Sequence, residues 1–191
     1  MFTLLALLTA GIESKAYDCE VNGIYYNLSG TEAIVTSGDN PYSGDITIPM
    51  VFSYNNTVYQ VTAIDDYAFN SNEKLSSVVI PSGVKTIGIY AFESSGIKNI
   101  TLPATVTTIG KCAFQWCKQL VSVSLPNSVD SIGNETFENC TLLASVNIPS
   151  SLKKEEVKAM FNLDGHQVNR EHHGLNIVHL SDGTTRKVMV K

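Results

Sequence analysis

The sequence has little positive charge, since its first 150 residues contain 6 Lys and Arg against 13 Asp and Glu. An acidic body without a basic stripe is a poor surface for a phosphate backbone, which argues against nucleic acid as a partner. The sequence also lacks an apolar segment of roughly 18 or more residues, the length that a transmembrane helix needs. With 43% apolar and 16% charged residues, the composition is that of an ordinary folded domain.

Motifs for phosphate binding, dinucleotide binding and acyl transfer are missing as well. All four histidines, His166, His172, His173 and His179, lie close to the C-terminus. A metal cluster there is one alternative, but His172-His173 without ordered Cys/His/Asp spacing is more typical of solvated side chains. The pair Asp65-Asp66 is likewise more typical of a solvated turn than of acid–base catalysis. We therefore expect no enzyme, no cofactor and no metal.

The N-terminus has the pattern of a secretory signal peptide over residues 1–16. An apolar run from Phe2 to Ile12 is followed by small residues at Ser14 and Ala16, which predicts cleavage after Ala16. A secreted or cell-surface location follows from this interpretation. The alternative is an amphipathic N-terminus without a sorting role.

One repeat unit occurs four times between Ile64 and Pro149. Each unit opens with the pattern Ile-Gly-x-x-Ala-Phe or a close variant of it. The four openings are Ile64-Asp65-x-x-Ala68-Phe69, Ile87-Gly88-x-x-Ala91-Phe92, Ile109-Gly110-x-x-Ala113-Phe114 and Ile132-Gly133-x-x-Thr136-Phe137. The phenylalanines recur at a nearly constant interval of roughly 23 residues, and self-similarity at such a period is typical of a solenoid, a propeller or an array.

Each unit continues into an alternating apolar stretch that ends at a proline, as in Leu120-x-x-Val123-x-Leu125-Pro126. Alternation predicts a strand with one buried face, and proline ends it because it has no N–H to donate. A second short extended piece, Val106 to Ile109, precedes Gly110. One such unit cannot bury enough apolar surface alone, so we expect stacked coils with their phenylalanines in one interior column.

Both ends differ from the repeat. Residues 17–63 are predicted to be an N-terminal β cap with strands at 23–28, 33–35, 45–48 and 58–61, and residues 64–150 the solenoid. Residues 151–191 are predicted to hold a capping helix over 153–160 and three β segments at 161–168, 174–180 and 187–191. Asp164-Gly165 and Asp182-Gly183 are hairpin turn signals there.

Two of the four cysteines stand at equivalent repeat positions, shortly after a phenylalanine. Cys117 and Cys140 occupy the position of Asn72 and Ser95 in the earlier units, which predicts an interior column of small residues. A 117–140 disulfide is the less favoured alternative, since neighbouring coils lie about 4.8 Å apart. Cys19 and Cys112 have no obvious partner.

The full pattern, Leu-x-x-Val-x-Ile-Pro-x-x-Val-x-x-Ile-Gly-x-x-Ala-Phe-x-x-Cys, resembles the BspA-type leucine-rich repeat. The best matches are Pro103 to Cys117 and Pro126 to Cys140, whereas the first unit departs with Asp65 in place of glycine. The resemblance implies a mainly β leucine-rich-repeat solenoid in an exported or surface protein linked to adhesion and protein binding. The final β segments resemble tails that act in some such proteins as secretion or anchoring signals.

The candidate binding surface is the outward side of the parallel strands. The predicted site residues on it are small and uncharged: Ser77, Val79, Asn99, Thr101, Ser122, Ser124, Ser145 and Asn147. Trp116, Tyr67 and Tyr90 are stronger anchors if exposed, although half-buried packing is slightly favoured for them. We expect a monomeric module that binds a protein or glycan, and the alternative is a structural spacer without a dedicated ligand.

Overall fold

The computed structural model describes residues 16–147, 160–161, 167–168, 174–179 and 185–190. The strands in these ranges are β1 (Cys19–Val21), β2 (Ile24–Ser29), β3 (Glu32–Thr36), β4 (Gly44–Thr47), β5 (Val51–Tyr54), β6 (Thr57–Ile64), β7 (Leu75–Val79), β8 (Thr86–Ile87), β9 (Asn99–Thr101), β10 (Thr108–Ile109), β11 (Ser122–Ser124), β12 (Ser131–Ile132), β13 (Ser145–Asn147), β14 (Met160–Phe161), β15 (Gln167–Val168), β16 (Gly174–His179) and β17 (Thr185–Val190).

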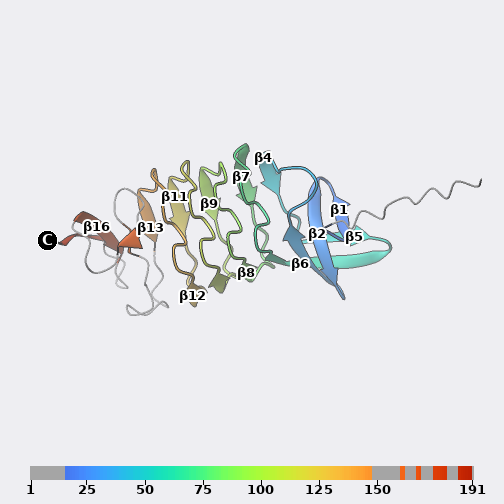
Figure 1. The fold of residues 1–191 in the computed structure, drawn as a ribbon. Helices are drawn as coiled ribbons and strands as arrows, with labels where there is room; N and C mark the ends of the chain where they lie inside the picture. The colour runs from blue at the N-terminus through green and yellow to red at the C-terminus, as the bar shows by residue number, and fades with distance from the viewer. Residues whose placement is uncertain (1–15, 148–159, 162–166, 169–173, 180–184, 191) are drawn as a thin grey trace, which may run out of the picture.

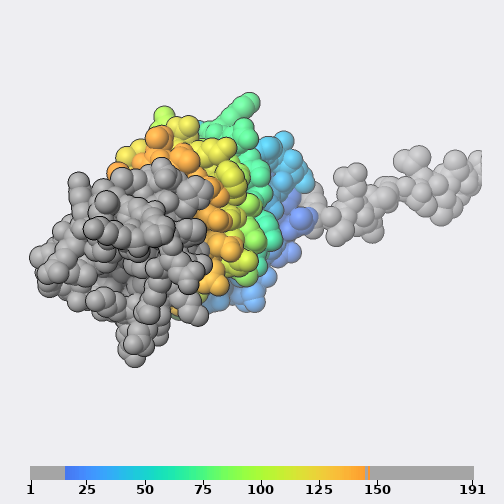
Figure 2. Space-filling model, turned by 60° about the vertical axis from the view of Figure 1, so that its left-hand side comes forward, coloured from blue at the N-terminus to red at the C-terminus, as the bar shows by residue number. Residues whose placement is uncertain are grey.

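Two sheets line the sides of a stack of coils. The long sheet has the order β1-β2-β3-β6-β8-β10-β12, with β5 also paired to β6, and the five-stranded sheet has the order β13-β11-β9-β7-β4. Every pairing in the five-stranded sheet is parallel. Figure 1 shows the coils side by side from β4 to β13, and Figure 2 shows them as successive bands of colour. The predicted mainly β coil architecture is confirmed.

The repeat phenylalanines form the predicted interior column. Phe69, Phe92, Phe114 and Phe137 are fully buried, and neighbouring rings stack with centroids 4.9, 5.2 and 5.4 Å apart. Burial of these rings against one another, with the aliphatic residues beside them, stabilises the stacking of one coil on the next.

Tyrosines of the N-terminal region extend this column beyond the repeats. Tyr42 packs against Phe69 with ring centroids 4.6 Å apart, and Tyr25 and Tyr17 follow in turn at 5.6 and 4.6 Å. The Tyr42 hydroxyl donates to the carbonyl of Thr36 at 2.7 Å, which satisfies its polar end inside the core. The predicted strand at 45–48 corresponds to β4, which pairs with β7 and so adds a strand to the five-stranded sheet.

Glycines in the repeat allow the coils to approach closely. A Cβ added to Gly110 would lie 2.6 Å from the carbonyl carbon of Gly88, and one added to Gly133 would lie 2.5 Å from that of Gly110. Gly88 in turn lies against the backbone of Asp65. The neighbour of Asp65 itself is the N-terminal region, because the Asp65 N–H donates to the carbonyl of Val35 at 2.8 Å and Asn27 Nδ2 donates to Asp65 Oδ2 at 3.4 Å. The departure from glycine therefore occurs where a segment other than these repeat coils packs against the chain.

The cysteine column is interior, as predicted. Cys117 and Cys140 are fully buried free thiols. Cys117 Sγ donates to the carbonyl of Phe92 at 2.9 Å, and Cys140 Sγ donates to that of Phe114 at 3.0 Å. A hydrogen bond with Cys117 and burial raise the pKa of the Cys140 thiol. The alternative of a 117–140 disulfide is not what the structure contains.

The C-terminal strands match the sequence prediction in part. Strands β16 and β17 pair antiparallel close to the segments expected at 174–180 and 187–191. The segment expected at 161–168 contributes to two short antiparallel strands, β14 and β15, and the turn signal Asp164-Gly165 stands between them in the sequence, outside the described residues. The predicted helix over 153–160 is wrong at Met160, because Met160 belongs to β14. Residues 153–159 of that prediction lie outside the described part of the chain. The predicted signal peptide also lies outside it, apart from Ala16.

Candidate binding surfaces

The predicted sheet residues lie in two parallel rows, which we call the outer rows. Register places Asp45, Ser77, Asn99, Ser122 and Ser145 in one row and Thr47, Val79, Thr101, Ser124 and Asn147 in the other. Side chains of Asn99, Thr101, Ser122 and Ser124 are exposed, and so is 57% of Val79. Ser145 and Asn147 are placed by their backbone alone.

Hydrogen bonds between neighbouring strands occupy the polar groups of the first outer row. Ser77 Oγ donates to Asp45 Oδ1 at 2.7 Å, and Ser122 Oγ donates to Asn99 Oδ1 at 3.2 Å. Asp45 was not among the predicted site residues, although the segment Asp45-Ile46-Thr47-Ile48-Pro49 has the alternation and final proline of the repeat strands. The outer rows thus carry mostly short side chains, and those of the first row bond to one another between neighbouring strands.

A second surface lies over the phenylalanine column, and we call it the turn face. It consists of the four equivalent segments 66–73, 89–96, 111–118 and 134–141. Three backbone N–H groups of each of the first three segments donate to carbonyls of the next segment, as from Trp116 to Glu138 at 2.8 Å. These bonds tie the coils together on the side that has no sheet.

Two residues of every turn segment have a left-handed backbone. They stand two positions before and two positions after the phenylalanine: Tyr67, Tyr90, Cys112 and Glu135 in the first position, and Ser71, Ser94, Trp116 and Asn139 in the second. Left-handed φ values favour Gly, Asn and Asp and are unusual for bulky residues. Aromatic side chains at three of these eight positions are therefore not explained by backbone preference.

The aromatic residues at these positions reach the surface. Tyr67 is 51% exposed and Trp116 is 42% exposed, whereas Tyr90 is half-buried. The rings of Tyr67 and Tyr90 are stacked with centroids 5.2 Å apart and planes inclined by 14°. Lys118 Nζ lies 5.3 Å from the centre of the Trp116 ring. Half-buried packing, slightly favoured from the sequence for all three, holds for Tyr90 and not for Tyr67 or Trp116.

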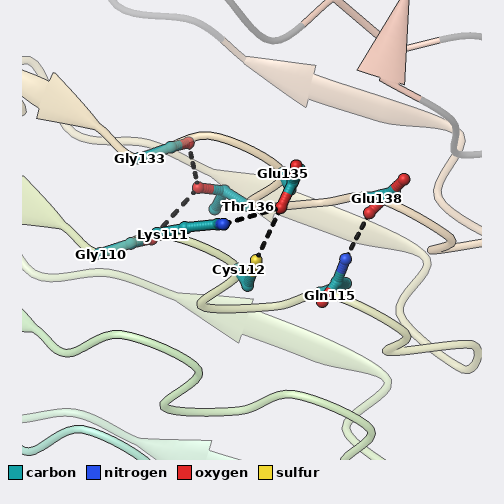
Figure 3. A network of polar contacts seen from close by, with 8 residues as sticks. All are labelled: Gly110, Lys111, Cys112, Gln115, Gly133, Glu135, Thr136 and Glu138. Carbon is teal, nitrogen blue, oxygen red and sulfur yellow. Dashed lines mark hydrogen bonds and ion pairs between the residues drawn. The ribbon is translucent and has the colours of Figure 1, made fainter.

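A polar network joins the third and fourth coils on this face (Figure 3). Cys112 Sγ donates to Glu135 Oε2 at 3.2 Å, and Lys111 Nζ lies 3.4 Å from the same oxygen. These contacts lower the pKa of Glu135, and the hydrogen bond from Cys112 has the larger effect. Burial raises the pKa of Cys112 to about 11, so its thiol is protonated and unreactive at neutral pH.

Amide and carboxylate groups pair along the middle of the turn face. Asn70 Nδ2 donates to Glu93 Oε2 at 2.7 Å, and Gln115 Nε2 donates to Glu138 Oε2. Thr136, which replaces the repeat alanine, donates through Oγ1 to the carbonyl of Gly133 at 2.6 Å. Side-chain bonds between coils therefore reinforce the backbone bonds of the turn face.

Groups with catalytic or metal-binding potential have structural partners instead. Asp66 Oδ1 accepts the N–H of Ile89 at 2.6 Å, and Asp65 Oδ1 accepts that of Asp66 at 2.9 Å, as a turn requires. Within residues 16–147 and the described C-terminal strands, no group of three His, Cys, Asp or Glu residues could hold a metal ion. His179 is in β16, and the other histidines lie outside the described ranges. No described helix is long and apolar enough to span a bilayer.

Parallel strands, short stacked coils of nearly equal length and a buried phenylalanine column define a leucine-rich-repeat solenoid. The BspA type leucine rich repeat region matches residues 53–169 in six copies. The chain therefore belongs to the BspA-type leucine-rich-repeat family. The matched residues extend on both sides of the four units seen in the sequence.

Solved structures of bacterial leucine-rich-repeat proteins are similar to this chain. One from Bacteroides capillosus shares 26% identity and a TM-score of 0.58, over 70% of this chain and 97% of that one. One from T. pallidum shares 27% identity and a TM-score of 0.50, over 68% and 71%. One from Bacteroides ovatus shares 27% identity and a TM-score of 0.43, over 72% and 49%, so the chain spans about half of that protein. No curated protein matches the chain.

Proposed function

We propose that this chain is an exported, non-catalytic module that binds other proteins at the bacterial surface through its turn face. The observation that supports this most is the exposure of Tyr67 and Trp116 on one rigid surface. Trp and Tyr are the residues that most often dominate protein–protein interfaces. The N-terminal segment 1–16 supports export, and the family resemblance supports a surface location.

The fold does not require an aromatic side chain at either position. The position of Trp116 is occupied by Ser71, Ser94 and Asn139 in the other three coils, all with the same left-handed backbone. Asn tolerates this backbone better than Trp does. An exposed indole at position 116 contributes less to the stability of the protein than a buried one would. It does offer a binding partner a large and rigid apolar surface.

The outer rows are the weaker candidate for the main contact. Val79 is the one large apolar residue among their described side chains, and the Ser and Asn groups already bond to one another. A partner would have to break these bonds to make its own. The outer rows would then enlarge the interface that the turn face of a monomeric module makes with its partner. If the turn face binds nothing, the chain is a structural spacer.

The test measures binding of the full exported chain to immobilised extracellular matrix proteins and mucins. We expect Trp116→Asn to weaken the strongest interaction at least about tenfold, which corresponds to about 1.4 kcal/mol. Val58→Asn removes an exposed apolar side chain from β6 and is expected to leave binding unchanged. A thermal midpoint for each variant verifies folding. Binding that is insensitive to both Trp116→Asn and Tyr67→Asn, or no binding at all, contradicts the proposal.

A further inference from the structure

The first half of the turn face has an excess of carboxylates in its own two segments, with Lys74 next to Glu73 at its edge and Lys111 of the following coil near Tyr90. Segments 66–73 and 89–96 contain Asp66, Glu73 and Glu93 and no Lys or Arg. The stacked rings of Tyr67 and Tyr90 lie in these same two segments. A cation near an exposed ring and carboxylates is attracted by two interactions, one with the negative face of the ring and one with the carboxylate charges.

Bonds within the protein hold two of these carboxylates in place. Asp66 accepts the N–H of Ile89, and Glu93 accepts the side-chain amide of Asn70 at 2.7 Å. Each is held through one oxygen and can accept further hydrogen bonds, since a carboxylate has about four acceptor sites. Groups that are already fixed lose little side-chain freedom when a partner binds.

The second half of the turn face already takes a cation from its own chain. Lys118 Nζ lies over the ring of Trp116. A guanidinium is planar, more weakly hydrated than an ammonium and stacks better on an aromatic ring, so an arginine can displace Lys118. With coils about 4.8 Å apart, Trp116 lies two coils from Tyr67, about 10 Å along the stack. Trp116 stands two positions after its phenylalanine, whereas Tyr67 stands two positions before, so a partner segment has to cross the turn face diagonally to reach both rings.

On the basis of the binding function proposed above, we propose that the turn face takes an arginine-bearing segment of a partner protein. One guanidinium stacks on Tyr67, attracted by the carboxylates of Asp66 and Glu93 in the same two segments, and a second replaces Lys118 on Trp116. A neutral glycan could use the rings but would gain nothing from the carboxylates, and an acidic glycan would be repelled by them. Charge complementarity therefore favours a cationic polypeptide.

The test uses the full chain and a labelled peptide, Gly-Arg-Gly-Ser-Arg-Gly, with fluorescence anisotropy as the readout. The matched probe has citrulline at both arginine positions, which keeps the shape and removes the charge. We expect the arginine peptide to bind at least about tenfold more tightly than the citrulline peptide, and a rise from low to physiological salt to reduce the difference.

Variants of the protein separate the two contacts. The combined change Asp66→Asn and Glu93→Gln keeps size and hydrogen bonding and should weaken arginine-peptide binding about tenfold. Lys118→Ala frees the Trp116 ring and should strengthen binding about two- to fivefold. Asp130→Asn, an exposed charge removed outside the turn face, should change it less than twofold.

Three results would overturn the cation proposal: no binding of the arginine peptide, equal binding of the citrulline peptide, or weaker binding by Lys118→Ala. A neutral oligosaccharide that binds in a Tyr67-dependent manner would show that the partner is a glycan. If matrix proteins bind in a Trp116-dependent manner and the arginine peptide does not, the partner chemistry fails and the binding function stands. If neither binds, both fail.

Discussion

Replacement of Gly110 by alanine tests how closely the coils must approach. The new Cβ would lie 2.6 Å from the carbonyl carbon of Gly88 and from the nitrogen of Ile89, about 0.8 Å inside ordinary van der Waals contact. These neighbours are backbone atoms, so no rotamer change relieves the overlap. The coils have to separate instead.

Separation by that amount weakens the hydrogen bonds that set the spacing. The Gly110 N–H donates to the carbonyl of Ile87 at 2.8 Å, and the Tyr90 N–H donates to the carbonyl of Lys111 at 3.0 Å. Both donor–acceptor distances would exceed about 3.5 Å, at which the hydrogen bonds are lost. Overpacking costs about 1–3 kcal/mol and each bond about 0.5–1.5 kcal/mol. The lower entropy of alanine in the unfolded chain returns about 0.4–1 kcal/mol. The expected loss in the free energy of unfolding is therefore about 3 kcal/mol.

Urea unfolding followed by circular dichroism measures this loss. With a slope of about 2 kcal/mol per molar urea, the midpoint should fall by about 1.5 M. Asp65→Ala is the matched control at the same position of the first unit, where a side chain is already present, and should cost less than about 1 kcal/mol. Equal midpoints for Gly110→Ala and the unaltered protein would refute the argument that this glycine column sets the spacing.

Three further outcomes follow from the interior and from the turn face. Phe114→Ala removes a ring stacked on both sides and should lower the free energy of unfolding by about 3–5 kcal/mol in the same assay. The four buried thiols, with the pKa of Cys112 raised to about 11 by burial, should resist a thiol-specific disulfide reagent at pH 8 in the folded protein and all react in urea. A hydrogen bond from Cys112 and the ion pair with Lys111 lower the pKa of Glu135 in the folded protein. These contacts therefore stabilise the fold at any pH above the pKa of Glu135 in the unfolded chain, and this stabilisation is lost as the pH falls through the lower pKa of the folded state. Glu135→Gln should remove that part of the pH dependence of the free energy of unfolding.

The sequence predicted those parts of the fold that repeat. Residues at one repeat position meet their own counterparts in the neighbouring coils, so period and residue type alone place the phenylalanine column and the interior cysteines. Strand β5 was missed because Val51 to Tyr54 lies outside the repeat. Its signal was present in Asn55-Asn56, both with positive φ, which turn the chain back into β6.

The left-handed positions of the turn face could not be predicted, because their usual markers are absent at most of them. Tyr67, Cys112 and Glu135 adopt this backbone with residue types that do not favour it. Hydrogen bonds to the next coil impose the conformation, and these depend on stacking that single-residue preferences do not contain. The exposure of Trp116 was missed for the same reason, since its direction is set by that backbone.

Variation between coils then separates the residues that build the solenoid from those available for recognition. Interior columns keep residues of similar size, identical in the phenylalanine column and small throughout in the column of Asn72, Ser95, Cys117 and Cys140, because each side chain packs between equivalent neighbours. The left-handed column before the phenylalanines changes from Tyr67 and Tyr90 to Cys112 and Glu135 along the stack, although the backbone requirement is the same in every coil. Packing between coils explains the pairs, since Tyr67 stacks on Tyr90 and Cys112 bonds to Glu135, but it does not explain why the aromatic pair and the polar pair stand in different coils. A partner that lies along the turn face, and meets each coil with a different part of itself, would account for it.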